Sequence, residues 1–193
     1  MNTPVDNFSH LLRTIPSLDK VINQLNSARI RYGIYAGAYV SIMTSNRPAK
    51  DVDILVADED FSKVRALFGD SSESQHDETV FLYPYGNKKI ELMTMGKYHF
   101  GNSHYSLQLT DLAWQHTSVL DNEGVEVRLC NPVETILLKA MLQRGSNEKK
   151  HDLEDIADLL EVAKIDRDYL IERLVEVEAD ERLIKVLRQF QLL

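Results

Sequence analysis

A run of six residues, Asp51 to Val56, constrains the fold of this chain more than any other segment. Its sequence, Asp-Val-Asp-Ile-Leu-Val, is β-branched and apolar in the way that is typical of a buried strand. Side chains alternate between the two faces of a strand, so Asp51 and Asp53 point to the same face. Two carboxylates held side by side near apolar residues repel each other and lose solvation. Such a pair persists mainly where a cation offsets the repulsion.

The acidic pair is suited to a divalent metal ion. Hard oxygen ligands at this spacing fit Mg²⁺, which also binds substrate phosphate oxygens. A third acid, Glu91, lies in the next apolar segment, 89–93. If the two strands are neighbours in a sheet, the three carboxylates converge and can hold two metal ions about 3.5–4 Å apart. A plainer interpretation stays open, because Asp-x-Asp is common by chance and a lone strand glutamate often faces solvent.

A turn of small residues precedes the acidic pair. Gly37 and Ala38 follow an apolar segment, 32–35, that predicts a strand, and they precede a helical pattern that ends near position 44. Small residues at such a turn let the backbone approach a phosphate, and the following helix directs its free N–H groups at it. Arg47 stands four residues before Asp51 and is a candidate to bind the same phosphates.

The remaining patterns predict a mixed sheet followed by helices. Apolar spacing and turn residues predict helices at 17–28 and 59–68 and hairpins at 80–93 and 118–129. From Pro132 onward the periodicity is helical, in the segments 133–144, 148–163, 167–177 and 180–191. We therefore expect an α/β (α+β) domain over residues 1–131, with a small mixed sheet flanked by helices. A C-terminal helical domain is expected over residues 132–193.

One lysine of the predicted helical part is a candidate residue of the same site. Lys139 stands among apolar residues in the segment 136–141. An ammonium group in such surroundings needs a partner or a ligand, so we expect it to contact a phosphate or an active-site carboxylate. A long lysine stem can instead reach solvent from an apolar surface. The charged run 149–155 is explained equally well by a solvated helix face.

The order of these features resembles the polymerase-beta-type nucleotidyltransferase superfamily, which has a Gly-Gly or Gly-Ser turn, a helix, Asp-x-Asp and a distant third acid. The spacing is most similar to a small-protein branch that includes the abortive-infection (toxin-type) nucleotidyltransferases, with Gly-Gly-x-Ala and Arg-x-Thr-x-Asp-x-Asp. The matching segments here are 36–39 and 47–53, and the helix 132–139 is similar to a Pro-Glu-x-Leu helix with an inward lysine. The likeness covers about residues 15–162.

The resemblance implies a nucleotidyltransferase fold and an enzyme that depends on Mg²⁺ or Mn²⁺. Such an enzyme moves a nucleoside monophosphate from an NTP to a hydroxyl acceptor, which can be RNA, a protein or a small molecule. Asp51 and Asp53 would bind metal, with Glu91 as the third ligand or as the base for the acceptor hydroxyl. The residues expected to bind the nucleotide are Gly37, Ala38, Arg47, Lys50 and Lys139.

Several departures from the family pattern favour a second interpretation. Ala36 replaces the first glycine of the turn, Tyr39 replaces a small residue, and Ala49 replaces the usual hydroxyl residue. Position 38 also lacks a serine that could hold a triphosphate. These losses favour a catalytically weakened nucleotide-binding or toxin–antitoxin module of the same fold as the alternative to an active enzyme.

The charge balance restricts the partners. Thirty acidic and 22 basic residues give a net charge of −8, which argues against a broad phosphate-binding surface but not against a local basic groove. No apolar run approaches the roughly 20 residues of a membrane helix, and the first residues lack the pattern of a signal peptide. We therefore expect a cytoplasmic protein that does not bind membranes. A partner protein bound through the acidic C-terminal helices stays open, and so does a homodimer.

Cysteine and histidine offer little further chemistry. The single cysteine, Cys130, excludes an internal disulfide and a multi-cysteine metal site. The histidines at 99, 104 and 116 match no common zinc spacing, so we expect structural or surface roles for them.

Overall fold

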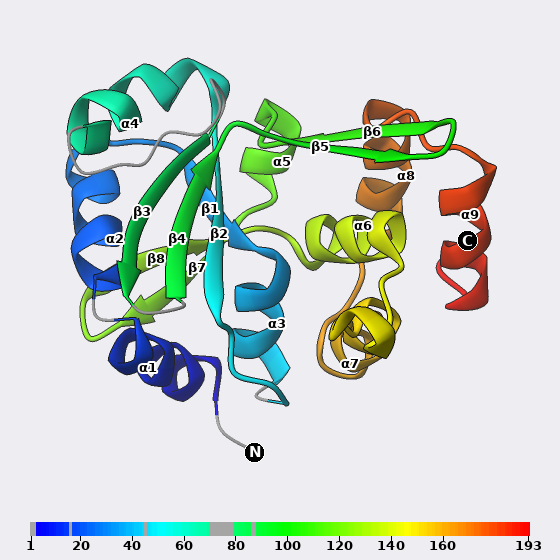
Figure 1. Cartoon of the computed structure of the whole chain (residues 1–193), viewed down its shortest axis with the longest axis horizontal. Coiled ribbons are helices and arrows are strands. Elements are labelled where there is room, and N and C mark those ends of the chain that lie inside the picture. Colours follow the sequence, from blue (N-terminus) through cyan, green and yellow to red (C-terminus); the bar gives the residue numbers. More distant parts are fainter. Residues whose placement is uncertain (1–2, 16, 45, 70–78, 86–87) are drawn as a thin grey trace.

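Short apolar segments pair into a central mixed sheet (Figure 1). The computed structural model describes residues 3–15, 17–44, 46–69, 79–85 and 88–193, and within them six strands lie in the order β3-β4-β2-β1-β8-β7. β3 and β4 pair antiparallel, as do β7 and β8, which confirms both predicted hairpins. The strand bounds are Tyr32–Tyr35 (β1), Asp51–Val56 (β2), Thr79–Tyr85 (β3), Lys88–Met93 (β4), Ser118–Asn122 (β7) and Val125–Leu129 (β8).

Strand β2 lies between β4 and β1, inside the sheet. It runs parallel to β4 and antiparallel to β1. Val52 and Ile54 are fully buried, whereas Asp51 and Asp53 keep intermediate exposure. The strand therefore presents an apolar face to the core and an acidic face to a cavity, as its alternating sequence predicts.

Helices cover the sheet and its edges. Helix α3 packs against β1 and β2, α2 against β8, α4 against β3, and α1 against α3 and β7. α3 begins three residues earlier than the sequence pattern suggests, directly at the end of β1. The bounds are Pro4–Thr14 (α1), Leu18–Ser27 (α2), Ala36–Thr44 (α3), Phe61–Phe68 (α4, after a 3₁₀ turn at Asp58–Asp60) and Asp111–Gln115 (α5).

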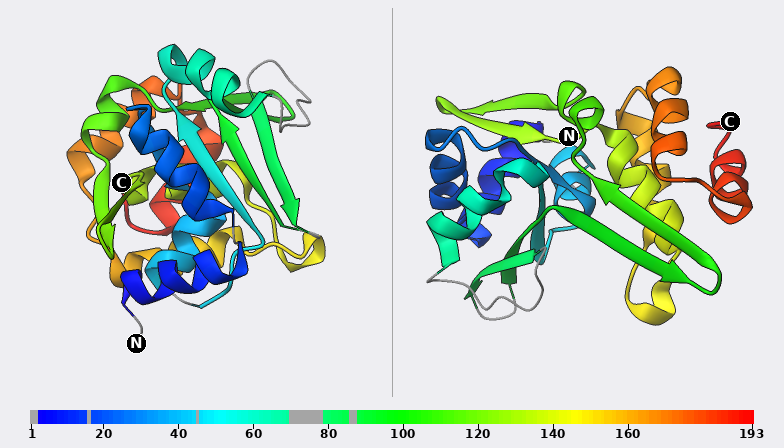
Figure 2. Two further views of the ribbon diagram at one scale, coloured as in Figure 1. Left: turned by 90° about the vertical axis from the view of Figure 1, so that its left-hand side faces the viewer. Right: turned by 90° about the horizontal axis from the view of Figure 1, so that it is seen from above.

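A third hairpin leaves the sheet and reaches the C-terminal helices (Figure 2). It consists of β5 (Met95–Phe100) and β6 (Ser103–Gln108), which pair only with each other within the described residues. The hydroxyls of Ser103 and Tyr105 both donate to Asp180, and the Arg182 guanidinium lies 4.7 Å from the Phe100 ring centroid. These contacts hold the hairpin against the helical part of the chain.

The C-terminal part is helical, which confirms the predicted α/β class with a helical extension. Helix α6 contacts β1, α3, α7 and α9, and its cap Asn131 accepts a hydrogen bond from the Val133 backbone N–H at 3.0 Å. The bounds are Pro132–Leu142 (α6), Asp152–Val162 (α7), Arg167–Glu176 (α8) and Glu181–Gln189 (α9), with a 3₁₀ turn at Ser146–Glu148. In the described ranges no helix combines the length and apolar character that a membrane crossing requires.

A buried ion pair joins α8 to α6. Arg173 is 1% exposed and Glu134 is fully buried. Their side chains form a bidentate ion pair, with Arg173 Nη2 2.7 Å from Glu134 Oε2 and Arg173 Nε 2.8 Å from Glu134 Oε1. Tyr169 also donates to Glu134, and the more exposed Glu176 accepts from Arg173. Since both charges are out of water, each offsets the cost of burying the other inside the core.

We expect Glu134→Gln to lower the free energy of unfolding by about 3–5 kcal/mol, because it leaves a buried guanidinium without its countercharge. Urea denaturation followed by circular dichroism measures the change. The matched control is Glu176→Gln, which removes the partly exposed carboxylate from the same arginine and should cost about 1 kcal/mol or less. Equal losses in the two variants would contradict this account of the core.

Candidate active site

The acidic face of β2 opens into a cavity of about 310 Å³. Its walls come from the end of β1, the first turn of α3, strands β2, β4 and β5, and the C-terminal end of α6 with the segment that follows. The described residues that line it are Tyr35, Ala36, Gly37, Asp51, Asp53, Lys89, Glu91, Met93, Tyr98, Leu138, Lys139, Leu142, Arg144 and Lys150.

Strand register brings the three predicted carboxylates together. In the parallel pair β2–β4, Asp53 lies opposite Glu91 and Asp51 lies opposite Lys89. On the other side of β2, Asp53 lies opposite Tyr35 of β1. Because residues two apart in a strand share a face, all three carboxylates lie on one face of the sheet. They line the same cavity.

Crowding of these acids changes their ionisation. Burial, together with the nearby charges of Asp51 and Glu91, raises the pKa of Asp53 to about 7, while Lys89 and Lys139 act in the opposite direction. At neutral pH the cluster is therefore close to the point at which it holds a proton. A bound cation would replace that proton as the source of positive charge.

Glu91 already has a cationic neighbour. The Lys89 ammonium forms an ion pair with the Glu91 carboxylate, whose side chain is 13% exposed. Among the described residues, no three His, Cys, Asp or Glu side chains are arranged so that they could together hold a metal ion. Asp51 and Asp53 remain, and Mg²⁺ is commonly bound by one or two carboxylates together with substrate phosphates. The residues present therefore fit a single divalent cation.

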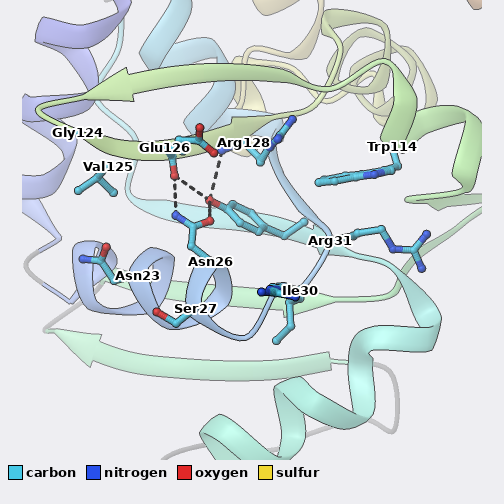
Figure 3. Close-up of a pocket in the computed structure, with 12 residues that line it drawn as sticks. Asn23, Asn26, Ser27, Ile30, Arg31, Trp114, Gly124, Val125, Glu126 and Arg128 are labelled. Atoms are coloured by element: carbon cyan, nitrogen blue, oxygen red, sulfur yellow. Dashed lines mark hydrogen bonds between the residues drawn. The ribbon is translucent and has the colours of Figure 1, made fainter.

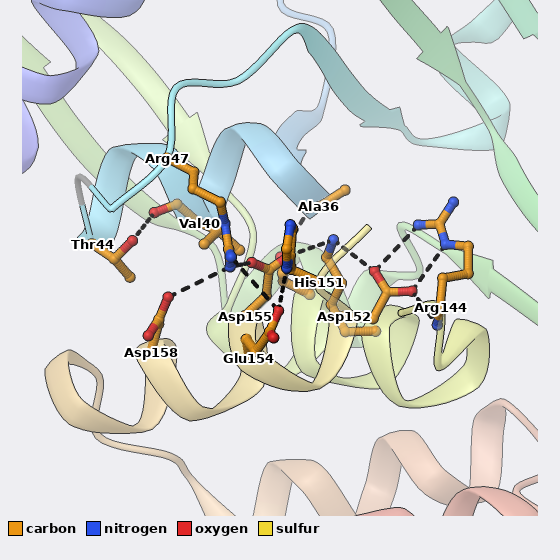
Figure 4. A network of polar contacts seen from close by, with 12 residues as sticks. Ala36, Val40, Thr44, Arg47, Arg144, His151, Asp152, Glu154, Asp155 and Asp158 are labelled. Carbon is orange, nitrogen blue, oxygen red and sulfur yellow. Dashed lines mark hydrogen bonds and ion pairs between the residues drawn. The ribbon is translucent and has the colours of Figure 1, made fainter. Parts of the chain in front are cut away.

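Lys139 lies at the cavity with carboxylate partners from α7. Its Nζ is 3.0 Å from an oxygen of Asp152 and 2.8 Å from an oxygen of Asp155, and the residue is 6% exposed. Asp152 also accepts hydrogen bonds from the backbone and side chain of Arg144 (Figure 4). The expected partner of the buried ammonium exists, but it belongs to the helical part and not to the β2–β4 acids.

Three predicted nucleotide-binding residues do not line the cavity. Arg47 forms an ion pair with Asp155 of α7 and has its guanidinium 3.6 Å from Asp158 (Figure 4). Lys50 is exposed, and the side chain of Ala38 is fully buried in the core. Only Gly37 and Lys139 of the five predicted nucleotide-binding residues are among the described residues that line the cavity.

Several polar or charged lining residues are not among the site residues that the sequence predicts, among them Lys89, Tyr98, Arg144 and Lys150. Lys89 stands two residues before Glu91, so the strand period alone places it on the acidic face. Tyr98, Arg144 and Lys150 carry no such signal, because they reach the cavity only through the β5–β6 hairpin and the packing of the helical part.

A second cavity, of about 460 Å³, lies near the other end of β1 (Figure 3). Tyr32, which lines it, is three residues from Tyr35, so the two side chains point to opposite faces of the sheet. Arg128 lies over the Trp114 ring at 5.1 Å, and Glu126 is the one acidic residue among the described residues that line this cavity. The clustered acids thus single out the smaller cavity as the candidate active site.

Solved structures share this arrangement of sheet and helices. An antigenic nucleotidyltransferase-like protein from Paracoccidioides brasiliensis is 20% identical at a TM-score of 0.57, over 94% of this chain and 88% of that one. The antibiotic-resistance factor ANT(2'')-Ia, in complex with adenylyl-2''-tobramycin, is 9% identical at a TM-score of 0.52, over 92% and 99%. The chain has the nucleotidyltransferase fold. The fold that the sequence resemblance implies is thereby confirmed. Neither a scan of protein-family models nor a search of curated proteins found a match.

Backbone strain lies at the turn between β1 and α3 of this fold. Ala36, which replaces the first glycine of the family pattern, has φ of 57°, in the left-handed region that favours glycine. Its backbone N–H donates to the Thr135 hydroxyl at 3.0 Å, so α6 supports the turn. The fold therefore keeps the glycine conformation although the side chain at this position is a methyl group.

Ala36→Gly should relieve this strain and raise the free energy of unfolding by about 0.5–1 kcal/mol, since the left-handed penalty exceeds the added freedom of the unfolded chain. The control is Ala38→Gly in the same helix, which has no such strain and should lose about 1 kcal/mol or more. Thermal and urea denaturation measure both. A loss of stability in Ala36→Gly would show that the turn is not strained.

Divalent cations should stabilise this nucleotidyltransferase fold through the acidic cluster. At a Mg²⁺ or Mn²⁺ concentration 100 times Kd, mass action predicts a gain of about 2.7 kcal/mol. Asp53→Asn should lose most of that gain, and its metal-free form should be at least as stable as the wild type because one repelling charge is gone. The exposed Asp58 provides the control, Asp58→Asn, which should keep the full gain. An unchanged metal response in Asp53→Asn would place the cation elsewhere.

Proposed function

We propose that the chain transfers a nucleoside monophosphate from an NTP to a hydroxyl acceptor, with Mg²⁺ or Mn²⁺ as the cofactor. The observation that supports this most is the in-register pairing of Asp53 with Glu91, which brings three carboxylates to one cavity in a nucleotidyltransferase fold. Acidic clusters of this kind are suited to a cation that carries phosphate oxygens.

The three acids have different roles in the proposed phosphoryl transfer. Asp51 and Asp53 would hold the cation, which when bound supplies charge neutralisation on the transferred phosphate. Glu91, on the adjacent strand, lies beside Asp53 where it can accept the proton of an acceptor hydroxyl. A hydroxyl bound at Glu91 would thereby be oriented toward the phosphorus.

The opposite wall of the cavity is suited to the triphosphate. Gly37 lies in the first turn of α3, and apart from its chain neighbours and the backbone of its own helix no atom lies within 4 Å of the place where a side chain at this position would begin. A phosphate can therefore approach the free backbone N–H groups of the helix. Positive charge on the same cavity comes from Lys139, Arg144 and Lys150. Fixed cations of this kind stabilise charge that develops during transfer.

A small hydroxyl compound is the acceptor class that fits best. With a net charge of −8, the chain as a whole repels a long polyanion such as RNA. The basic groups face a cavity of about 310 Å³ and do not form a broad groove. The complex of ANT(2'')-Ia with adenylyl-2''-tobramycin provides one example of a small adenylylated compound in this fold.

A catalytically weakened nucleotide-binding or toxin–antitoxin module is the second candidate. Two observations favour it: Ala36 occupies a glycine conformation, and Arg47 pairs with α7 instead of facing the cavity. Such a module would keep nucleotide affinity in the absence of turnover.

The test is incubation of the full chain with each of four α-labelled NTPs and Mg²⁺ or Mn²⁺, with hydroxyl-bearing small compounds, RNA and the protein itself as acceptors. We expect label on a small compound, a loss of about 100-fold or more in Asp53→Asn, and no loss in Asp58→Asn. Nucleotide binding without transfer would favour the second candidate. If neither binding nor transfer occurs with any NTP, the proposal is wrong.

A further inference from the structure

Lys89 places a permanent positive charge inside the acidic cluster. It stands two residues before Glu91 in β4, so both side chains lie on the cavity face. Its ammonium is ion-paired with the Glu91 carboxylate and lies opposite Asp51 in the strand register. The Lys89 side chain is 46% exposed, so it reaches the cavity from the solvent side.

This ion pair changes what Glu91 can do. An oxygen that holds an ammonium group is less available to a metal ion, and the ammonium repels a dication placed beside it. In line with this, the described residues contain no three-ligand metal group, although all three acids line one cavity. Asp51 and Asp53 both belong to β2, the strand that pairs with the strand of the ion pair.

We propose that Lys89 takes the place of a second cation, so that the nucleotide-free chain binds one divalent ion, at Asp51 and Asp53. The inference rests on the proposed function and narrows it. Glu91 is then held by Lys89 and is not a metal ligand. The remaining cations that line the cavity, Lys139, Arg144 and Lys150, belong to the helical part of the chain.

The test is the stoichiometry of Mn²⁺ binding to the full, nucleotide-free chain, measured by the electron paramagnetic resonance signal of free Mn²⁺ and by calorimetry. We expect one Mn²⁺ per wild-type chain and two per Lys89→Met chain, since that variant frees Glu91. Lys150→Met removes the same charge from the same cavity, at a residue that forms no ion pair with the other residues that the structure describes. The Lys150→Met chain should still bind one Mn²⁺.

A charge-neutral double variant, Lys89→Met with Glu91→Gln, keeps the test decisive should Lys89→Met alone fail to fold. It leaves the net charge of the cavity unchanged and should bind one Mn²⁺ at close to the wild-type affinity. If Glu91 were a ligand, the affinity would fall by roughly 10-fold or more, because even outer-shell partners of metal sites contribute 10–100-fold. Far-ultraviolet circular dichroism checks the fold of each variant.

The outcomes separate this inference from the proposed function. Two Mn²⁺ ions in the wild type, one in a folded Lys89→Met, or a 10-fold loss in the double variant would overturn the role of Lys89 alone. Absence of Mn²⁺ binding in the wild type and in every variant would overturn the metal-dependent function as well.

Discussion

The in-register pairing of β2 with β4 decides the electrostatics of the whole cavity. It sets Asp53 beside Glu91 and Asp51 beside Lys89, which places three negative charges and one positive charge on a single face. A slip of β4 by one residue would turn Lys89 and Glu91 to the opposite face. The register is held by the fully buried residues at the alternate positions, Val52, Ile54, Ile90 and Leu92. Packing of the core thus positions the charges.

The helical part of the chain holds the opposite charges in place. Asp152 and Asp155 of α7 are almost completely buried, and between them they bind the side chains of Lys139, Arg144 and Arg47 (Figure 4). Each buried carboxylate is tolerated because it is paired, and each cation is thereby fixed in position. Two of these cations line the acidic cavity. Positive charge that is already oriented needs little rearrangement when a phosphate arrives.

Sequence reasoning recovers the parts of the site that follow a local period. The two-residue spacing of Asp51 and Asp53, with an acid in the next apolar strand, leads directly to the observed juxtaposition. Arg47 shows the limit of such reasoning: it is close to Asp51 in the chain, but its guanidinium binds α7. Its partner lies 108 residues further on, and no spacing rule reaches that far. The β5–β6 hairpin is likewise unpredicted, since it packs against the helices and not within the sheet.

The β5–β6 hairpin contributes Tyr98 to the wall of the cavity, and Gly96 leaves the space that the Tyr98 ring occupies. The Tyr98 ring folds back over Gly96, where an added Cβ would lie 2.4 Å from the Tyr98 hydroxyl oxygen. The hydroxyls of Tyr98 and Tyr35 share a hydrogen bond, and Tyr35 lies opposite Asp53 in the sheet. Burial raises the pKa of Tyr98 to about 12, so the phenol stays neutral at physiological pH and adds no charge. An uncharged ring at this place displaces water from the acids and so strengthens their mutual repulsion and their attraction for a cation. Tyr98, which lies outside the main sheet, therefore contributes to the strength with which Asp53 attracts a cation.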